Sequence, residues 1–354
     1  MVTGLEHPWA MAWLPNGDIL VTERAGRLRT IRAGKLLPEA LAGLEKVSNV
    51  EADQLFATKQ GGLLDLALHP KFQENRLIYF SYAQGTKEAN RTQVARAKLE
   101  DGKLSDWEVI FKNDNTKMGG QHFGSRLLWL DDETLLVSIG DGGNPPVKFE
   151  GEYIRNQAQN LKTHFGKVVR LSANGEPPTD NPFTAEHSAT KDIFSLGHRN
   201  IQGLAYDEAT KTIWATEHGA RGGDELNRIV AGKNYGWSEV SYSREYVSFL
   251  PVADKTSAPG MEQPSRVWTP SIAPSGLAVY RHERFPEWQG NLFAGGLVSK
   301  TIRRLVLNNE GRVKKETKLV IDARVRDVRV GPDGYLYVLT DEENGKLLKI
   351  TSLK

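Results

Sequence analysis

Residues 9–24 read WAMAWLPNGDILVTER, which is an apolar stretch, a Pro-Asn-Gly-Asp turn and a second apolar stretch that ends in polar residues. The turn residues favour the tight connection of a β-hairpin, and the stretches on either side have the length of buried strands. Residues 327–341, DVRVGPDGYLYVLTD, closely repeat this scheme near the other end of the chain. A hairpin that recurs in this way indicates a fold built from repeated units.

The scheme recurs between these two copies, with turns of different length. The further copies are residues 63–82, 127–141, 203–217 and 276–296. A further strand pair follows most copies, for example at Gly26–Ala33, Gly166–Leu171, Leu226–Val230, Thr301–Leu307 and Gly345–Thr351. Each unit therefore reads as two apolar strands followed by a hairpin to an outer strand.

A single sheet of this kind cannot bury both of its faces, so the units must pack on one another, and closing them into a ring protects their edges. We therefore expect an all-β protein, a six-bladed β-propeller with four-stranded antiparallel blades, in which residues 1–354 form one domain. A pair of β-sandwiches would not explain the recurring turn, and β-helix repeats are far shorter than the roughly 50–75 residues between copies. The extra length lies in loops at 142–165 and 240–270.

The composition is that of an ordinary globular chain, with 354 residues, 39% hydrophobic and 25% charged. A formal net charge of +2 and the lack of a Lys/Arg run give no indication of nucleic-acid binding. The absence of cysteine excludes disulfides, thiolate metal ligands and a cysteine nucleophile. No apolar run approaches the roughly 20 residues of a membrane-spanning helix, so we expect no membrane insertion. The start, MVTGLEHPWAM, lacks signal-peptide features, so we expect either no signal peptide or one removed before this point.

The segment MGGQHFGSR at residues 118–126 places His122 between glycines, directly before the apolar run at 127–130. Glycines allow tight turns and close approach of a ligand, and the ends of inner propeller strands surround a central channel. Asp141 ends the second strand of the same unit, where it could orient the imidazole and raise its basicity. The alternatives are that His122 bonds a neighbouring loop and that Asp141 caps the turn at Gly142.

Three further polar residues precede inner strands at the same end of the channel. Gln60 could donate to a ligand hydroxyl, and Arg199 beside Asn200 suits a planar, oxygen-rich ligand because a guanidinium binds such groups in a bidentate way. A solvated loop is the alternative for each of them.

The loop TEHGARGGDELN at 216–227 combines glycines with acidic residues and can turn its carbonyl groups inward, which indicates calcium chemistry, although a purely structural loop competes.

Lys300, Arg324 and Arg326 lie near the inner strands of the last two units, and strand alternation puts the two arginines on one face. Two such cations repel each other unless an anion or an acid lies between them, and a polycarboxylate ligand would supply that anion. Surface charge is the alternative. The sequence lacks the G-x-S-x-G and H-E-x-x-H motifs and any glycine-rich phosphate loop before a helix, which disfavours a nucleotide cofactor.

Taken together, the segments resemble the soluble quinoprotein glucose dehydrogenase family, and most closely its aldose sugar dehydrogenase branch. The matching segments are HPWAMAWLPNGDILVTERAGRL, QGGLLDLALHP, GGQHFGSRL, GHRNIQGLA, EHGARGGDELN, GKNYGW and RDVRVGPDGYLYVLTDE, which follow the family's order from near residue 7 to near residue 343. The resemblance implies a six-bladed propeller that binds pyrroloquinoline quinone (PQQ), with Ca²⁺ in the channel mouth.

The resemblance also implies roles for individual residues. His122 matches the general base that takes the proton of the sugar's C1 hydroxyl while hydride passes to C5 of the quinone, and Asp141 matches the carboxylate that orients this base. The remaining implied contacts are Arg199 and Asn200 with the quinone, Lys300, Arg324 and Arg326 with its three carboxylates, the carbonyls of Gly219 and Ala220 with Ca²⁺, and Gln60 and Trp268 with the substrate.

Some positions depart from the glucose-specific members. Gln121 stands where they carry an acid, Ala220 replaces a common proline, and the loop 240–268 matches them poorly, so we expect an open pocket and a broad range of aldoses. Glu239 could join a second, structural calcium site. The resemblance further implies an external electron acceptor, a periplasmic or secreted location, and a monomer or weak dimer.

Two other functions remain open at this point. A calcium-dependent lactonase-type propeller would hold its metal with several converging carboxylates, where this sequence offers arginines instead. A recognition module with a dead site would lack the set formed by His122, Arg199, Arg324 and Arg326, which is present.

Overall fold

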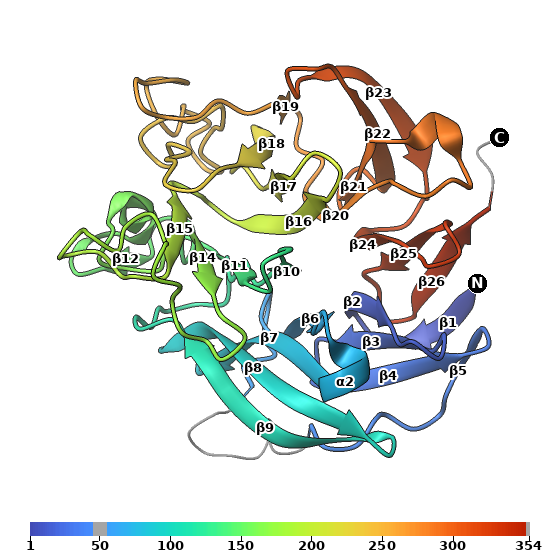
Figure 1. Cartoon of the computed structure of the whole chain (residues 1–354). Coiled ribbons are helices and arrows are strands. Elements are labelled where there is room, and N and C mark those ends of the chain that lie inside the picture. Colours follow the sequence, from blue (N-terminus) through green and yellow to red (C-terminus); the bar gives the residue numbers. More distant parts are fainter. Residues whose placement is uncertain (45–54, 352–354) are drawn as a thin grey trace.

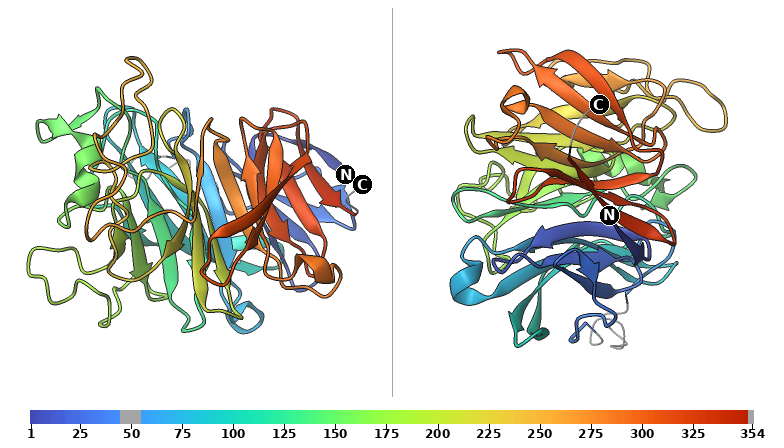
Figure 2. Two further views of the ribbon diagram at one scale, coloured as in Figure 1. Left: turned by 90° about the horizontal axis from the view of Figure 1, so that it is seen from above. Right: turned by 90° about the vertical axis from the view of Figure 1, so that its right-hand side faces the viewer.

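Each of the six repeated hairpins forms the two inner strands of a four-stranded antiparallel sheet, and the six sheets form a ring (Figure 1). The computed structural model describes residues 1–44 and 55–351. Side views show the sheets standing next to one another like blades around an axis (Figure 2). The prediction of a six-bladed β-propeller with four-stranded antiparallel blades is confirmed.

The blades are numbered 1 to 6 along the chain, and their strands are given from the inside outward. Blade 1 consists of β2 (Pro8–Trp13), β3 (Ile19–Glu23), β4 (Arg27–Arg32) and β5 (Lys35–Leu36). Blade 2 consists of β6 (Leu63–Leu68), β7 (Leu77–Gly85), β8 (Asn90–Glu100) and β9 (Lys103–Lys112). Blade 3 consists of β10 (Leu127–Trp129), β11 (Leu135–Ile139), β14 (Lys167–Leu171) and β15 (Ile193–Leu196).

Blades 4 to 6 follow the same plan. Blade 4 consists of β16 (Ile201–Asp207), β17 (Thr212–Glu217), β18 (Asp224–Ile229) and β19 (Arg266–Trp268). Blade 5 consists of β20 (Pro274–Val279), β21 (Leu292–Gly296), β22 (Thr301–Leu307) and β23 (Val313–Val320). Blade 6 consists of β24 (Val325–Val330), β25 (Leu336–Thr340), β26 (Gly345–Ile350) and β1 (Val2–Leu5).

Among residues 1–44 and 55–351, the elements outside the blades are short and lie in the connections. They are α2 (Phe72–Asn75), the 3-10 helices η1 (Ile154–Gln159) and η2 (Pro286–Trp288), and the small hairpin of β12 (Lys148–Phe149) and β13 (Glu152–Tyr153).

Six hydrophobic clusters hold the ring together, and each lies between two adjacent blades. The inner strands also contact their neighbours all the way round, since β2 touches both β6 and β24, β10 touches β6 and β16, and β20 touches β16 and β24. The apolar residues of the repeats therefore bury their surface between blades.

A network of buried charged groups centred on Arg126 connects the inner strands of different blades. Arg126 is 1% exposed, and its guanidinium donates to the Gln202 carbonyl at 2.6 Å and pairs with Asp327 at 3.1 Å and Asp65 at 3.5 Å. It also lies 4.1 Å from the ring centroid of Trp9. One side chain from blade 3 thus contacts blades 1, 2, 4 and 6, and a buried charge of this kind is tolerated because it is paired.

Bulges mark the channel end of the inner strands. In five blades the register between the two inner strands shifts near the start of the inner strand, at Pro8/Ala10, Leu63/Leu66, Ile201/Gly203, Pro274/Leu277 and Val325/Asp327. A β-bulge inserts an unpaired residue and redirects its side chain. The residues inserted in this way include Trp9, Gln202 and Arg326.

The last blade is completed by the beginning of the chain. Strand β1 pairs with β26, so the two ends of the described propeller lie in one sheet (Figure 1). The side chain of Leu5 is fully buried in the cluster between blades 6 and 1, with Met11, Val21 and Leu347. The sequence repeats do not include this strand.

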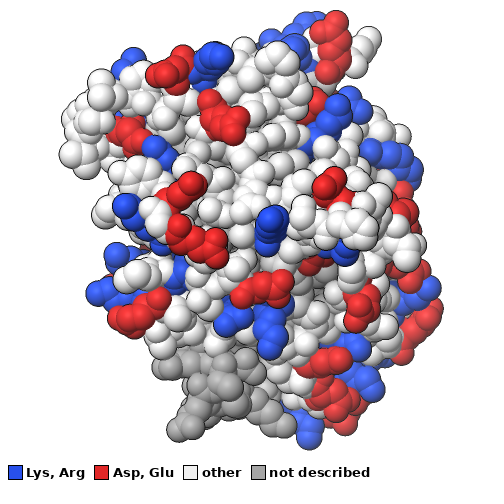
Figure 3. Space-filling view, turned by 90° about the vertical axis from the view of Figure 1, so that its left-hand side faces the viewer, with Lys and Arg blue, Asp and Glu red and all other residues white. Residues whose placement is uncertain are grey.

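Lys and Arg are interspersed with Asp and Glu on the face that Figure 3 shows, without a continuous band of either sign. In the part of the chain that the structure describes, no helix has the length and apolar character needed to cross a membrane.

The closing strand gives a test of ring stability. Replacing Leu5 with Ala removes a fully buried side chain, and we expect the free energy of unfolding to fall by about 2–5 kcal/mol. The matched control is Val320→Ala on the outermost strand of blade 5, where the side chain is 77% exposed and the expected change is within about 0.5 kcal/mol. Urea denaturation of both variants measures the difference, and equal midpoints would show that β1 does not stabilise the closed ring.

Candidate functional site

A cavity of ≈ 500 Å³ opens at the end of the channel where the bulges lie. Its lining comes from three repeated positions: the residues before inner strands, the bulged residues, and the residues directly after second strands. The residues before inner strands are His7, Lys59, Gln60, Asn200, Ala273 and Arg324. The bulged residues are Trp9, Gln202 and Arg326, and the residues after second strands are Arg24, His218, Leu297 and Asp341. The cavity thus lies at the ends of the inner strands, where the sequence predicts a ligand site.

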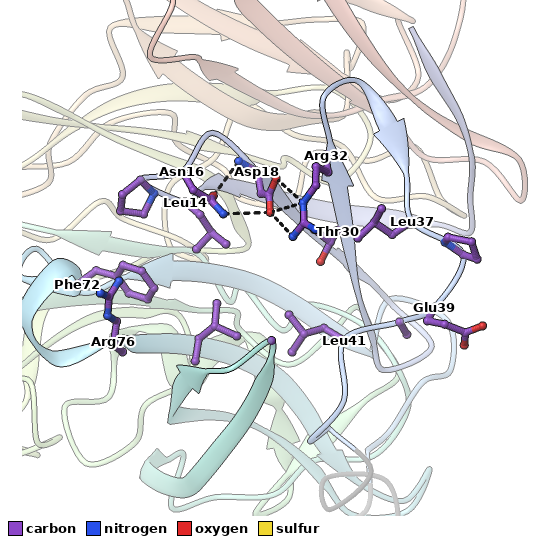
Figure 4. A pocket seen from close by; sticks show the side chains of 15 residues that line it. Leu14, Asn16, Asp18, Thr30, Arg32, Leu37, Glu39, Leu41, Phe72 and Arg76 are labelled. Carbon is purple, nitrogen blue, oxygen red and sulfur yellow. Dashed lines mark hydrogen bonds and ion pairs between the residues drawn. The ribbon is translucent and has the colours of Figure 1, made fainter.

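A second cavity of ≈ 650 Å³ lies between blades 1 and 2 (Figure 4). Its walls are mainly apolar, and its Asp18 carboxylate already accepts hydrogen bonds from Arg32 at 2.8–3.1 Å. None of the candidate site residues lines it. The central cavity is therefore the candidate functional site.

The His122 imidazole is held by Asp141, as the hairpin pairing predicts. His122 Nδ1 lies 2.6 Å from Asp141 Oδ1, and both side chains are buried. The Asp141 carboxylate also accepts the indole N–H of Trp237 at 2.7 Å and the Gly143 N–H at 3.1 Å. Since a carboxylate oxygen can only accept a hydrogen bond, Nδ1 of the neutral imidazole carries the ring proton and Nε2 keeps a free lone pair.

The electrostatic surroundings favour a neutral His122. Burial lowers the pKa of the imidazole, and the nearby Arg199 guanidinium lowers it further, while Asp141 acts in the opposite direction. The backbone of His122 has a φ of +51° and its N–H donates to Gln60 Oε1 at 2.8 Å. The turn thus places a neutral proton acceptor beside the channel.

Arg199 and Asn200 are buried side by side at the start of blade 4. Arg199 donates to the His218 carbonyl at 3.1 Å and to Asn144 Oδ1 at 2.7 Å, but its buried Nε–H has no hydrogen-bond partner among the described residues. The Glu217 carboxylate accepts the Arg199 backbone N–H. Asn200 Oδ1 accepts the Gly124 N–H at 3.0 Å, which ties it to the His122 turn.

Arg324 and Arg326 both line the cavity, and an acid of the protein lies between them. The Asp341 carboxylate is 2.6 Å from Arg326 and 3.5 Å from Arg324. The Arg326 guanidinium, helped by His7 and Arg24, holds the pKa of Asp341 well below its usual range despite its burial. The sequence left open whether a ligand or an acid separates the two arginines, and the structure provides an acid.

The cavity nevertheless has an excess of positive charge. Arg24 and Lys59 line it together with the two arginines, against the single carboxylate of Asp341. Within the part of the chain that the structure describes, the Nε–H groups of Arg24 and Arg326 are buried without a hydrogen-bond partner. Unpaired buried donors are costly, so this wall suits a ligand with several anionic oxygens.

The 219–223 loop next to Arg199 exposes main-chain carbonyls. Asp224 fixes this loop by accepting the Gly219 N–H at 2.9 Å and the Ile272 N–H at 2.7 Å, and Ser243 Oγ accepts the Ala220 N–H at 3.0 Å. Among residues 1–44 and 55–351, no hydrogen bond is made to the carbonyl oxygens of Gly219 and Ala220. Free carbonyl oxygens of this type are calcium ligands.

Other predicted residues lie elsewhere. Lys300 is exposed on the turn between β21 and β22 and does not line the cavity. Trp268 is buried on the outermost strand of blade 4, where its indole N–H donates to Glu316 at 3.3 Å. Gln121 is partly buried directly before His122.

Glu239 is exposed in a separate depression with Asp254, and the described residues contain no group of three or more His, Asp or Glu side chains that could hold a metal ion. The calcium interpretation of this chain therefore depends on main-chain carbonyls.

Sequence reasoning missed Trp9, Arg24, Gln202, His218 and Asp341. The signal that could have found them is the repeat itself, because each occupies a position equivalent to that of a predicted residue in another blade. His218 is the clearest case: its Nε2–H donates to the Pro274 carbonyl at 2.6 Å, and burial together with Arg199 lowers its pKa to about 3.

Comparison with known proteins adds to this geometry. The family model described as glucose/sorbosone dehydrogenase matches residues 5–349. An uncharacterised protein of Synechocystis is 61% identical, covering 99% of this chain and 85% of that protein. The aldose sugar dehydrogenase YliI of Escherichia coli is 40% identical, covering 98% of this chain and 90% of its own. The structure of the PQQ-bound form of an aldose sugar dehydrogenase from Streptomyces coelicolor matches with a TM-score of 0.76 and 26% identity, covering 98% of this chain and 95% of that chain.

The low pKa of His218 has a consequence for stability. Because the folded state keeps His218 neutral while the unfolded chain protonates it below about pH 6.5, stability is full above that pH and falls as the pH decreases toward 3. For His218→Gln we expect the loss of unfolding free energy between pH 7.5 and 5 to be smaller than in the parent by up to about 2 kcal/mol. Urea denaturation at both pH values measures this, and an equal loss in both proteins would contradict a neutral His218.

Proposed function

The chain belongs to the glucose/sorbosone dehydrogenase family and is an oxidoreductase, and from this premise we propose that it oxidises aldose sugars at C1 to the lactone with PQQ and Ca²⁺. The observation that carries the proposal is the cationic cavity beside the His122–Asp141 pair. PQQ is flat and carries three carboxylates, so it matches a cavity of ≈ 500 Å³ lined by four cationic side chains.

The residues present fit the cofactor. The unpartnered Nε–H groups of Arg24, Arg199 and Arg326 are donors available to quinone oxygens or carboxylates. The free carbonyls of Gly219 and Ala220 would hold Ca²⁺ near Arg199. When bound, PQQ supplies the hydride acceptor at C5, and Ca²⁺ polarises the carbonyl that becomes reduced.

His122 acts as the general base in this proposal. Its Nε2 takes the proton of the C1 hydroxyl, and the resulting imidazolium is stabilised by Asp141, which also fixes the tautomer and the ring orientation. Trp237 and Gly143 hold Asp141 in turn, so the base needs little reorganisation during the reaction. The electrons leave to an external acceptor.

The substrate side of the cavity is assigned to Gln60 and Gln121. Gln60 lines the cavity and bonds the His122 backbone, which places a polar side chain next to the base. Trp268 and Lys300 are not part of the proposal, since Trp268 is buried in the outermost strand of its blade and Lys300 is exposed on the turn between β21 and β22. We also propose that the enzyme works in the periplasm or outside the cell.

The hydrolytic alternative has no support from the side chains. A lactonase-type propeller needs several carboxylates that converge on a metal, and no such group occurs in the ranges that the structure describes. A lactone-hydrolysis assay without quinone provides the direct comparison.

The first experiment is an absorbance titration of the apoprotein with PQQ and Ca²⁺, followed by addition of aldoses. We expect turnover only with both components, and a loss of roughly 10²–10⁴-fold in kcat for His122→Ala, because this change removes the general base but not the cationic wall. Near-native turnover of the variant would refute the role of His122, and hydrolysis of lactones by the apoprotein would refute the oxidoreductase function.

A second experiment addresses the calcium loop. A β-carbon at Gly219 would overlap the Gly222 carbonyl oxygen, so Gly219→Ala must shift the loop. We expect the Ca²⁺ concentration for half-maximal reconstitution to rise by roughly 10-fold or more, since Ca²⁺ binding depends on ligand geometry. Ala220→Gly keeps both carbonyls and serves as the control. Unchanged Ca²⁺ dependence in Gly219→Ala would place the ion elsewhere.

A further inference from the structure

A buried lysine lies close to the His122–Asp141 pair and has no part in the mechanism above. Lys117 is 5% exposed, and its Nζ donates to Asn90 Oδ1 at 2.9 Å and lies 4.0 Å from the ring centroid of Phe123. The main chains of Lys117 and Asn90 pair through two hydrogen bonds of 2.8 and 2.9 Å. The ammonium group is therefore fixed against the residue that directly follows His122.

The stem of the same side chain lies beside Asp141. A β-carbon at Gly142 would be 3.1 Å from Lys117 Cδ, so the lysine packs directly on the residue after the carboxylate. Within the described ranges Lys117 forms no direct ion pair, and its attraction to Asp141 acts through space. Burial lowers the pKa of Lys117 to about 7, and Asp141 opposes this decrease.

Several charged or ionisable groups surround Lys117 and His122. They are Asp141 after β11, Arg199 before β16, His218 after β17, and the exposed Lys87 on the loop between β7 and β8, whose carbonyl accepts the Gly119 N–H at 2.8 Å. Of these, Asp141 favours a protonated His122, whereas the Arg199 guanidinium disfavours it; the Lys117 ammonium adds to the effect of Arg199. Lys117 is thus a second cation that opposes protonation of the base.

We propose that Lys117 is a positioning residue for the general base: its ammonium group, stacked on Phe123 and attracted by Asp141, steadies the His122 turn and keeps the imidazole ready to accept a proton. This inference rests on the proposed role of His122. Because Lys117 loses its own proton near neutral pH, its electrostatic effect acts at and below neutrality and fades in alkaline solution.

The first test uses the apoprotein and does not depend on activity. The imidazole signals of ¹⁵N-labelled protein are followed by NMR against pH, with His122→Gln to identify the His122 signals. Lys117→Met removes the charge at similar length, and we expect the pKa of His122 to rise by about half a unit or more. Lys112→Met, an exposed lysine on β9, removes the same charge elsewhere and leaves the pKa unchanged. A His122 that titrates alike in both variants, or stays neutral throughout in both, overturns the proposal.

The second test is the pH profile of kcat/KM after reconstitution. On the acid limb we expect Lys117→Met to fall about 3–10-fold below the parent, and above about pH 8 the two profiles coincide. If Lys117→Met does not fold, Lys117→Gln replaces it, because glutamine can bond Asn90 without a charge, and we expect the same loss on the acid limb. Lys117→Arg keeps a positive charge, and we expect it to restore the parent profile. An equal loss at every pH indicates a purely structural lysine and refutes the proposal. No turnover in the parent refutes the proposed function instead, and the NMR result still decides the role of Lys117.

Discussion

The pairing of Arg126 with Asp65 and Asp327 is the constraint on which the rest of the propeller depends. These groups lie at the centre of the ring, where removing one partner leaves an uncompensated buried charge at a cost of about 3–5 kcal/mol. They come from blades 3, 2 and 6, so the pairs form only when the blades stand in the correct order around the axis. Arg126 also donates to the carbonyls of Gln202 and Arg326, so the network touches two residues that line the central cavity.

The ring turns a simple repeat into a site with different chemistry on each side. Every blade offers residues before its inner strand and after its second strand, and in five blades a bulge adds another. Blade 3 uses these positions for the His122–Asp141 pair, whereas blade 6 uses them for Arg324, Arg326 and Asp341. The proton acceptor and the cationic wall therefore occupy the same kinds of position in two different blades, and the blades differ in which side chains stand there.

The fold and part of the site could be predicted from the sequence because hairpin turns and apolar stretches have local signals. The contact of His122 with Asp141 and the place of Asn200 in the cavity lining were predictable because each residue stands at the end of a recognisable strand. Strand β1 was missed because a strand of four residues, two of them exposed, has no apolar pattern of its own. Trp9 and Gln202 were missed because a bulge changes the alternation that assigns side chains to faces. Lys300 and Trp268 lie outside the cavity lining, because nearness to a strand in sequence does not fix where a side chain points: Lys300 is on a solvent-facing turn and Trp268 on an outermost strand.

The pairing of β1 with β26 also sets the order of events during synthesis. Residues Val2–Leu5 leave the ribosome before every other strand of the six blades, yet their partner strand ends at Ile350. At about 5–20 residues per second, roughly 20–70 s pass between the two. Five blades can assemble on the nascent chain during this time, while the first strand waits without a partner. The ring closes only after translation of the last blade, so this final step is one that a chaperone or a secretion machinery could delay.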